Sequence, residues 1–209
     1  MTSAPALVPA AGRRREQQKE QTRLDLALAA FELAQAHGLA NVRVPQIAAA
    51  VGVSPRTFNN YFPSKEAAIV WPATLRATLM AANLADRPAA EPLVEALVAA
   101  VTGLYTETGM DGLPPGWQRG LRALVAAEPA LHGEYLKAAA GAESALADAI
   151  ARRTGAEPGQ LKPLILAAVI VGAERAANLY WARQDPSASL AEVVRTAVDM
   201  AVRGLAGPG

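Results

Sequence analysis

The sequence predicts an all-α protein of about nine helices: an N-terminal three-helix unit that carries a helix-turn-helix, followed by a larger helical body. Hydrophobic residues make up 52% of the chain but aromatic residues only 5%, and alanine, a strong helix former and weak strand former, fills much of the difference. Apolar residues recur at helical spacings, and proline and glycine clusters separate these periodic segments.

Composition also excludes several kinds of site. The chain has no cysteine, which excludes disulfides, cysteine-ligated zinc and thiol nucleophiles. Its longest strictly apolar run, residues 164–173, is shorter than the ~18–20 residues that a membrane-spanning helix needs. At the N-terminus, apolar residues precede the basic residues 13–15, which is the reverse of a secretory signal. We therefore expect a soluble, cytoplasmic protein without a membrane partner.

The net charge of +1 conceals an uneven distribution along the chain. Residues 1–65 carry eight Lys and Arg against four acids, whereas residues 66–209 carry twelve against fifteen. A basic first third on a mildly acidic body favours an anionic partner for the N-terminal unit alone.

The N-terminal unit is expected over residues 13–63, after a disordered leader at residues 1–12 that shows no hydrophobic periodicity. Its first helix is predicted over residues 16–37, where apolar side chains form one stripe. Gly38 follows at the point where a left-handed residue is needed to stop the helix.

Two short helices joined by a tight turn form the predicted helix-turn-helix. They are expected over residues 45–51 and 55–61, and each has a proline at its first position, where the missing N–H has no intrahelical partner to lose. Residues 52–54, Gly-Val-Ser, form the turn, and Ser54 is the predicted cap of the second helix.

The helical body, which we expect to bind a ligand and to dimerise, is predicted over residues 64–209. Its first helix, capped by Ser64, is predicted to continue to Leu84 with a bend at Pro72. The further helices are predicted at residues 93–108, 117–128, 130–154, 161–184 and 190–205.

The second helix of the motif divides by face. Phe58 and Phe62 are four residues apart and are predicted to be buried. Arg56, Asn59 and Asn60 lie on the opposite face, and these side-chain types pair bidentately with guanine and adenine edges. The side chains expected to contact phosphate are Thr57, Tyr61 and, at the N-terminus of the following helix, Lys65.

The segment GVSPRTFNNYFPSKEAAI resembles the signature of the tetracycline-repressor (TetR/AcrR) family. The resemblance spans residues 13–69 and implies a dimeric transcriptional regulator with an all-helical ligand-binding domain. The chain departs from the family pattern at residues 43–45, Arg-Val-Pro, where a serine or threonine usually touches phosphate, and Arg43 is a candidate to replace that contact. It also departs at Asn59 and Asn60, where an aromatic residue and a histidine are common, so the operator cannot be inferred from a relative. The expected DNA-contacting residues are Arg43, Pro45, Gln46, Ser54, Pro55, Arg56, Thr57, Asn59, Asn60, Tyr61 and Lys65.

Two features of the N-terminal unit each allow two interpretations. Arg13, Arg14 and Arg15 form either an arm that enters the minor groove or a solvated basic tail. The three helices form either a DNA-binding unit or an ordinary packing unit. The combination of the Gly-Val-Ser turn, the aromatic pair and the polar face favours DNA binding.

The helix predicted at residues 161–184 points to a dimer. It is apolar all round for almost three turns, and such a helix must be buried on every side. One face is therefore expected to meet a second subunit, and the family resemblance implies a four-helix interface made by the last two helices of each copy. The alternative is a monomeric core with unusually apolar helices.

Small alanine side chains in the body leave room for a ligand cavity. Glu174 and Asn178 are four residues apart on an apolar helix, so they either bond to each other or anchor a ligand head group. The C-terminal pattern also resembles actinobacterial regulators with an acyl-CoA-like ligand domain, which implies a small hydrophobic effector, with acyl-CoA as a candidate. The candidate lining residues are Trp71, Leu104, Tyr105, Trp117, Leu121, Tyr135, Glu174, Asn178 and Trp181.

An enzyme is the main competing class, and the residues speak against it. The two histidines, His37 and His132, are far apart, and no metal, phosphate-loop or nucleophile motif is present. An architectural DNA-binding protein without a ligand is a third class, which a fully packed body would support. We expect a repressor without a cofactor that leaves a palindromic operator when an effector shifts the helix that begins at Lys65.

Overall fold

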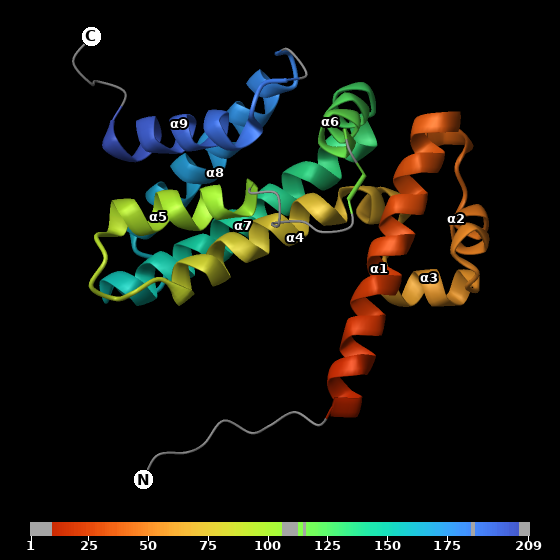
Figure 1. Ribbon diagram of the computed structural model, residues 1–209, viewed down its shortest axis with the longest axis horizontal. Helices are drawn as coiled ribbons and strands as arrows, with labels where there is room; N and C mark the ends of the chain where they lie inside the picture. The colour runs from red at the N-terminus through yellow and green to blue at the C-terminus, as the bar shows by residue number, and fades with distance from the viewer. Residues whose placement is uncertain (1–9, 106–112, 115, 185–186, 205–209) are drawn as a thin grey trace. The chain divides into compact units, whose positions relative to one another are not determined.

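The computed structural model describes residues 10–105, 113–114, 116–184 and 187–204, and every regular element in these ranges is a helix. The predicted all-α class is thereby confirmed. The chain divides into two compact units, Met1–Ile69 and Val70–Gly209, each with its own helices (Figure 1). This division falls inside a helix, slightly beyond the boundary expected at residue 63.

The first unit opens with a helix that is longer than expected. α1 spans Ala10–His37, so it includes residues 10–12 of the expected leader, while residues 1–9 lie outside the described residues. Alanine favours the helix and extends it beyond the amphipathic segment. α1 ends as predicted at Gly38, whose φ is +78° and whose N–H donates to the Ala34 carbonyl at 2.9 Å.

Three short elements complete the first unit. The 3₁₀ turn η1 spans Leu39–Asn41, α2 spans Val44–Val51 and α3 spans Pro55–Tyr61. α1 packs against α2, and α2 against α3. The buried core of this unit includes Leu26, Ala30, Phe31, Ile47, Phe58 and Phe62.

The second unit is a bundle of longer helices. α4 spans Lys65–Asp86, with Pro72 inside it, and most of its length belongs to this unit. α8 packs against α7 and α9, α5 packs against α9, and α6 against α7. The remaining elements are α5 (Leu93–Thr102), η2 (Gly103–Tyr105), α6 (Trp117–Ala127), α7 (Pro129–Thr154), α8 (Leu161–Trp181) and α9 (Leu190–Arg203). Its most deeply buried side chains include Leu84, Leu97, Leu146, Ile150, Ile170 and Val194.

The helix predicted at residues 93–108 ends early, at Thr102, and continues only as the 3₁₀ turn η2; residues 106–108 lie outside the described residues. The Thr102 hydroxyl donates to the Val98 carbonyl at 2.8 Å, and the Asn83 amide donates to the Ala100 carbonyl at 3.1 Å. Side chains thus occupy carbonyls near the end of the helix, which favours its termination there.

α8 also ends before its predicted limit at residue 184. One guanidinium nitrogen of Arg119, on α6, donates to the carbonyls of Trp181, Ala182 and Gln184 at 3.1, 3.2 and 3.1 Å. Its guanidinium carbon lies 3.9 Å from the centre of the Trp181 ring. A cation at the negative end of a helix stabilises the last carbonyls, so the Arg119 side chain, from α6, stabilises the C-terminus of α8.

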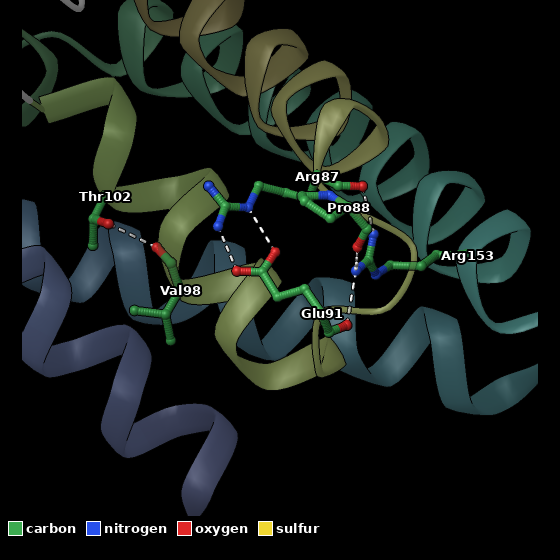
Figure 2. Close-up of polar contacts among 6 residues, drawn as sticks. All are labelled: Arg87, Pro88, Glu91, Val98, Thr102 and Arg153. Carbon is green, nitrogen blue, oxygen red and sulfur yellow. Dashed lines mark hydrogen bonds and ion pairs between the residues drawn. The ribbon is translucent and has the colours of Figure 1, made fainter.

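A second arginine secures the turn between α4 and α5 (Figure 2). Arg153, on α7, donates to the carbonyls of Arg87, Pro88 and Glu91 at 3.2, 2.6 and 2.9 Å. Arg87 also donates from Nε to the Glu91 carboxylate at 2.7 Å. These contacts fix the geometry with which α5 enters the bundle.

Candidate nucleic-acid interface and buried polar site

The turn between α2 and α3 is set by two local features. Gly52 is the C-cap of α2 in the left-handed conformation, with φ 74° and ψ 27°. Ser54 caps α3 as predicted: its hydroxyl accepts from the Thr57 N–H at 3.0 Å and bonds to the Thr57 hydroxyl at 2.9 Å. The glycine turns the chain and the serine starts the next helix, so α3 leaves α2 at a defined angle.

α3 has the two faces that its sequence predicts. Phe58 and Phe62 are buried, and their ring centroids lie 5.8 Å apart. Arg56, Asn59 and Asn60 are exposed. The half-buried residues Thr57 and Tyr61 lie at the edges of the exposed face. The buried aromatic side of α3 therefore leaves its polar side chains exposed to solvent.

Lys65 takes a role that the sequence analysis missed. Its ammonium group donates to the carbonyl of Leu39 at 2.6 Å and to that of Val42 at 2.7 Å. Two of its three N–H donors thus bond to the backbone before α2. The sequence analysis expected Lys65 to bind phosphate and did not predict these bonds. Because these partners lie 26 and 23 residues away, spacing along the chain gives no signal of them.

The N-terminus of α2 is closed by its own residues. The Gln46 N–H donates to the Arg43 carbonyl at 3.0 Å, and the Gln46 side-chain oxygen accepts from the Arg43 N–H at 2.8 Å. Arg43, Pro45 and Gln46 are exposed, as are Ser54 and Pro55 at the start of α3. The expected DNA-contacting residues therefore lie on accessible surface of the first unit, with Lys65 turned toward the backbone.

The second unit contains a cluster of polar side chains, all buried except the half-buried Tyr105, which we call the polar site: Arg76, Tyr105, Arg122, Tyr135, Glu174 and Asn178. Glu174 accepts at Oε1 from the Asn178 amide at 2.7 Å and from the Tyr105 hydroxyl. Asn178 also donates to the Tyr105 oxygen at 3.1 Å, and Arg76 approaches the same oxygen at 3.4 Å. The first of the two alternatives for Glu174 and Asn178, a bond between them, is present.

Two guanidinium groups are buried in the polar site. Arg76, on α4, is 2% exposed and lies over the Tyr105 ring at 4.6 Å. Arg122, on α6, is 7% exposed and lies over the Tyr135 ring at 4.6 Å. Burial, followed by the nearby Glu174, raises the pKa of both tyrosine phenols. Both phenols therefore stay neutral near pH 7 and supply hydrogen-bond donors, not negative charge.

A cavity of about 20 Å³ lies against these groups. Arg76, Arg122, Tyr135 and Glu174 line its polar side, and small apolar side chains line the rest. This volume holds about one water molecule. The polar site is therefore almost fully packed, and the ligand-sized cavity expected from the small alanine side chains is not found there.

Comparison with known proteins identifies the chain. Residues 27–68 match the family model described as bacterial regulatory proteins, tetR family, and residues 91–206 match a model described as MftR C-terminal domain. The HTH-type transcriptional regulator TcmR of Streptomyces glaucescens is 32% identical over 171 residues, which cover 80% of this chain and 76% of TcmR. The chain belongs to the tetR family of bacterial regulatory proteins.

Solved structures of this family share the fold. A putative TetR-family regulator from Rhodococcus sp. has a TM-score of 0.54 at 20% identity, covering 87% of this chain and 98% of its own. FadR, a fatty acid degradation regulator from Bacillus halodurans, has a TM-score of 0.55 at 17% identity, covering 88% and 96%. FadR from Thermus thermophilus, solved with lauroyl-CoA, has a TM-score of 0.50 at 22% identity, covering 90% and 99%.

Membership of the tetR family settles the class of the protein. It is a DNA-binding transcriptional regulator and not an enzyme. The matched N-terminal segment contains α2, the turn and α3, so the helix-turn-helix predicted from the sequence is the DNA-binding element of this tetR-family protein.

The candidate ligand-lining residues of this regulator do not all lie at one place. Tyr105, Tyr135, Glu174 and Asn178 meet in the polar site. The Trp181 ring nitrogen instead donates to the Ala188 carbonyl at 2.7 Å, which makes Trp181 part of the packing around the end of α8. The others are buried or half-buried and do not line the 20 Å³ cavity: Trp71, Leu104, Trp117 and Leu121.

Sequence reasoning missed Arg76 and Arg122, the two cations of the polar site. Each lies among apolar residues on a predicted helix, in the segments ATLRATL and GLRALV. An arginine on the apolar stripe of a helix is the signal that indicates a buried charge.

Within its own unit α8 leaves one face exposed, and the sequence analysis expects a second subunit to cover one face of this helix. Its large apolar residues Leu161, Ile165 and Tyr180 are 70%, 50% and 59% exposed. Leu164, Val169 and Leu179 are exposed as well, so one face of the helix is largely apolar, with the exposed Arg175 among these residues. Among the described helices, only α8 is long and apolar enough to cross a membrane. In its most apolar stretch, 39% is buried within the protein.

Proposed function

We propose that this tetR-family protein is a homodimeric repressor whose α3 helices read a palindromic operator and which a small effector releases from DNA. One observation carries the DNA-reading part: the buried Phe58 and Phe62 hold Arg56, Asn59 and Asn60 on an exposed face. Arginine and asparagine are the side chains that pair bidentately with guanine and adenine in the major groove.

The remaining expected contacts act on the phosphate backbone. Thr57 and Tyr61 flank the reading face, and Arg43, Pro45, Gln46, Ser54 and Pro55 lie on exposed surface at the starts of α2 and α3. The exposed guanidinium of Arg43, amide of Gln46 and hydroxyl of Ser54 are side-chain types that bind phosphate oxygens. Lys65 supports this surface chiefly by holding the η1–α2 backbone, with one ammonium donor left for a phosphate.

Arg14 and Arg15 are exposed residues of α1, and the side chain of Arg13 lies outside the described residues. Because the segment is helical, we propose that it contacts DNA phosphates as the end of a helix and not as an extended arm in the minor groove. Because α1 begins at Ala10, a contact of this kind differs from both interpretations in the sequence analysis, a minor-groove arm and a solvated tail.

Dimerisation is proposed through α8 and α9. The exposed apolar face of α8, together with the half-exposed Met200 of α9, is the kind of surface that a permanent partner covers. A two-fold dimer would bring two α3 helices to successive major grooves, ~34–36 Å apart. Such a protein acts in the cytoplasm, where the DNA is.

The effector is proposed to bind in the second unit and to act through α4. This helix begins in the first unit, at Lys65, and continues through the second unit to Asp86. A ligand shifts an equilibrium only by its difference in affinity between two states, so the effector must prefer the state that binds DNA poorly. Acyl-CoA is a candidate because FadR of Thermus thermophilus was solved with lauroyl-CoA.

A mobility-shift assay on the DNA upstream of the protein's own gene tests the proposal, with and without fatty acyl-CoAs. We expect a shifted band of discrete size that unlabelled specific DNA displaces more effectively than random DNA. The absence of any shift at low salt would contradict the regulator function. A shift that no acyl-CoA changes would contradict only the acyl-CoA candidate.

A further inference from the structure

Among the described residues, the polar site holds two buried cations and one buried acid. Arg76 and Arg122 are both buried, and the polar site has a single acid, Glu174. The Oε1 atom of Glu174 is already bonded to Asn178 and Tyr105. In the part of the chain that the structure describes, neither arginine forms an ion pair.

Arg76 is the less satisfied of the two cations. Its Nε and Nη2 atoms are buried without a hydrogen-bond partner among the described residues, and Nη1 has only a long contact of 3.4 Å to Tyr105. Taking a guanidinium out of water without a partner is strongly unfavourable. Natural proteins retain such a group chiefly where a ligand or a function requires it.

The cavity beside Arg76 has the character of a head-group site. Arg76, Arg122 and Tyr135 supply donors on one side. The rest of the lining is apolar and mostly alanine, and we call it the alanine wall: Ala73, Ala138, Ala139, Ala142 and Val171. Donors next to small apolar side chains suit a ligand with a charged end and an apolar body.

We propose that the effector is an organic acid whose carboxylate binds between Arg76 and Arg122, with its apolar body along the alanine wall. This inference rests on the proposed function and specifies the chemistry of its effector. A carboxylate matches the fork of donors on a guanidinium and neutralises the surplus charge. A thioester such as acyl-CoA has no carboxylate at its acyl end, so the two candidates differ in what they place beside Arg76.

The location of Arg76 also links binding to regulation. The cavity holds about one water molecule, so a carboxylate enters only if the side chains around it move. Arg76 lies on α4, the helix that starts at Lys65 in the first unit. Pairing with the ligand therefore acts on the helix proposed to carry the signal.

The test compares acids with uncharged analogues on the full-length protein. Butanoate, octanoate and dodecanoate, each with the alcohol and the CoA thioester of equal chain length, are titrated by calorimetry. We expect at least one acid to bind ~10-fold or more tightly than its alcohol, as loss of a charge-assisted hydrogen bond implies. Equal binding of every acid and its alcohol, or a preference for the thioester, would overturn the proposal.

Variants identify the site. Arg76→Met removes the charge and keeps an apolar side chain, so we expect it to lose ~10-fold or more of its affinity for the acid and little for the alcohol. Arg152→Met, at an exposed arginine of α7, is the matched control and should bind the acid like the unaltered protein. Unchanged acid binding by Arg76→Met would place the carboxylate elsewhere and refute the assignment.

Two further arms keep the outcome decisive. If Arg76→Met does not fold, Arg76→Lys replaces it, because lysine keeps the charge but not the forked pair of donors. The site is supported if this variant binds the acid more weakly than the unaltered protein binds the acid, but more tightly than the unaltered protein binds the alcohol. If potassium chloride alone raises the melting temperature as much as the acid, a simple inorganic anion fills the cavity and the proposal fails. Operator binding by the ligand-free protein is measured in parallel: no binding would contradict the proposed function, whereas operator binding without any preference for the acid would contradict only this inference.

Discussion

The ammonium group of Lys65 ties the start of α4 to the backbone around η1. It donates two hydrogen bonds, to the carbonyl of Leu39, which also accepts from the Val42 N–H, and to the carbonyl of Val42. Both acceptors immediately precede α2, so the lysine fixes where the helix-turn-helix begins. A single side chain thus connects the start of α4 to the segment before α2.

Replacing Lys65 by methionine should lower the free energy of unfolding by ~2 kcal/mol or more, because two charge-assisted hydrogen bonds are lost and their acceptors stay partly buried. Urea denaturation measures this difference. Lys19→Met, at an exposed lysine of α1, serves as the control and should change little. Equal stability of the two variants would mean that Lys65 is not a structural anchor.

Arg56 belongs to the exposed face of α3 and should act on DNA, not on stability. We expect Arg56→Ala to weaken operator binding by ~1–3 kcal/mol and to weaken binding to random duplex much less, because a bidentate contact to a base is lost. Fluorescence anisotropy on both duplexes measures the two losses. Equal losses on specific and random DNA would exclude Arg56 from reading bases.

At the scale of elements, arginines from neighbouring helices decide where several segments end. Arg119 of α6 bonds to the carbonyls at the end of α8, and Arg153 of α7 holds the α4–α5 turn. The contact of Arg119 is one reason why α8 ends before its predicted limit, whereas α5 ends early where Thr102 and Asn83 bond to its carbonyls. The turn of the helix-turn-helix is different, because its glycine and serine cap are local and were predicted correctly.

The left-handed Gly52 makes a test of the turn. No atom lies within 4 Å of a Cβ placed on Gly52, so Gly52→Ala is opposed only by its positive φ, at ~1–2 kcal/mol. Gly141 has equal space around it but lies inside α7, where alanine should stabilise by ~0.5–1 kcal/mol. Thermal unfolding should therefore move in opposite directions for the two variants, and a shift in the same direction would contradict this account.

At the scale of the whole molecule, the exposed apolar face of α8 is the proposed dimer interface. Ile165 on α8 and Leu136 on α7 are similarly exposed, at 50% and 45%. If α8 forms the dimer interface, Ile165→Glu should shift the protein toward monomer because it buries a charge there, while Leu136→Glu should remain dimeric. Sedimentation velocity separates the two species. Dimers of both variants, or monomers of both, would place the interface elsewhere.

The sequence by itself determined the features whose causes lie within a few residues. The caps at Ser54 and Ser64, the positive φ of Gly38 and Gly52, and the buried and exposed faces of α3 follow from local chemistry and helical spacing. These features also carry the family resemblance, so the regulator class was readable from the chain alone.

Only the tertiary structure decided which side chains meet across the bundle. The Tyr105–Glu174 pair is separated by 69 residues and the Tyr105–Asn178 pair by 73, and Arg76 and Arg122 reach them from two further helices. Helical periodicity indicates which face of a helix is buried, but not which face of another helix it contacts. The surplus charge of the polar site arises from that packing, and no spacing along the chain records it.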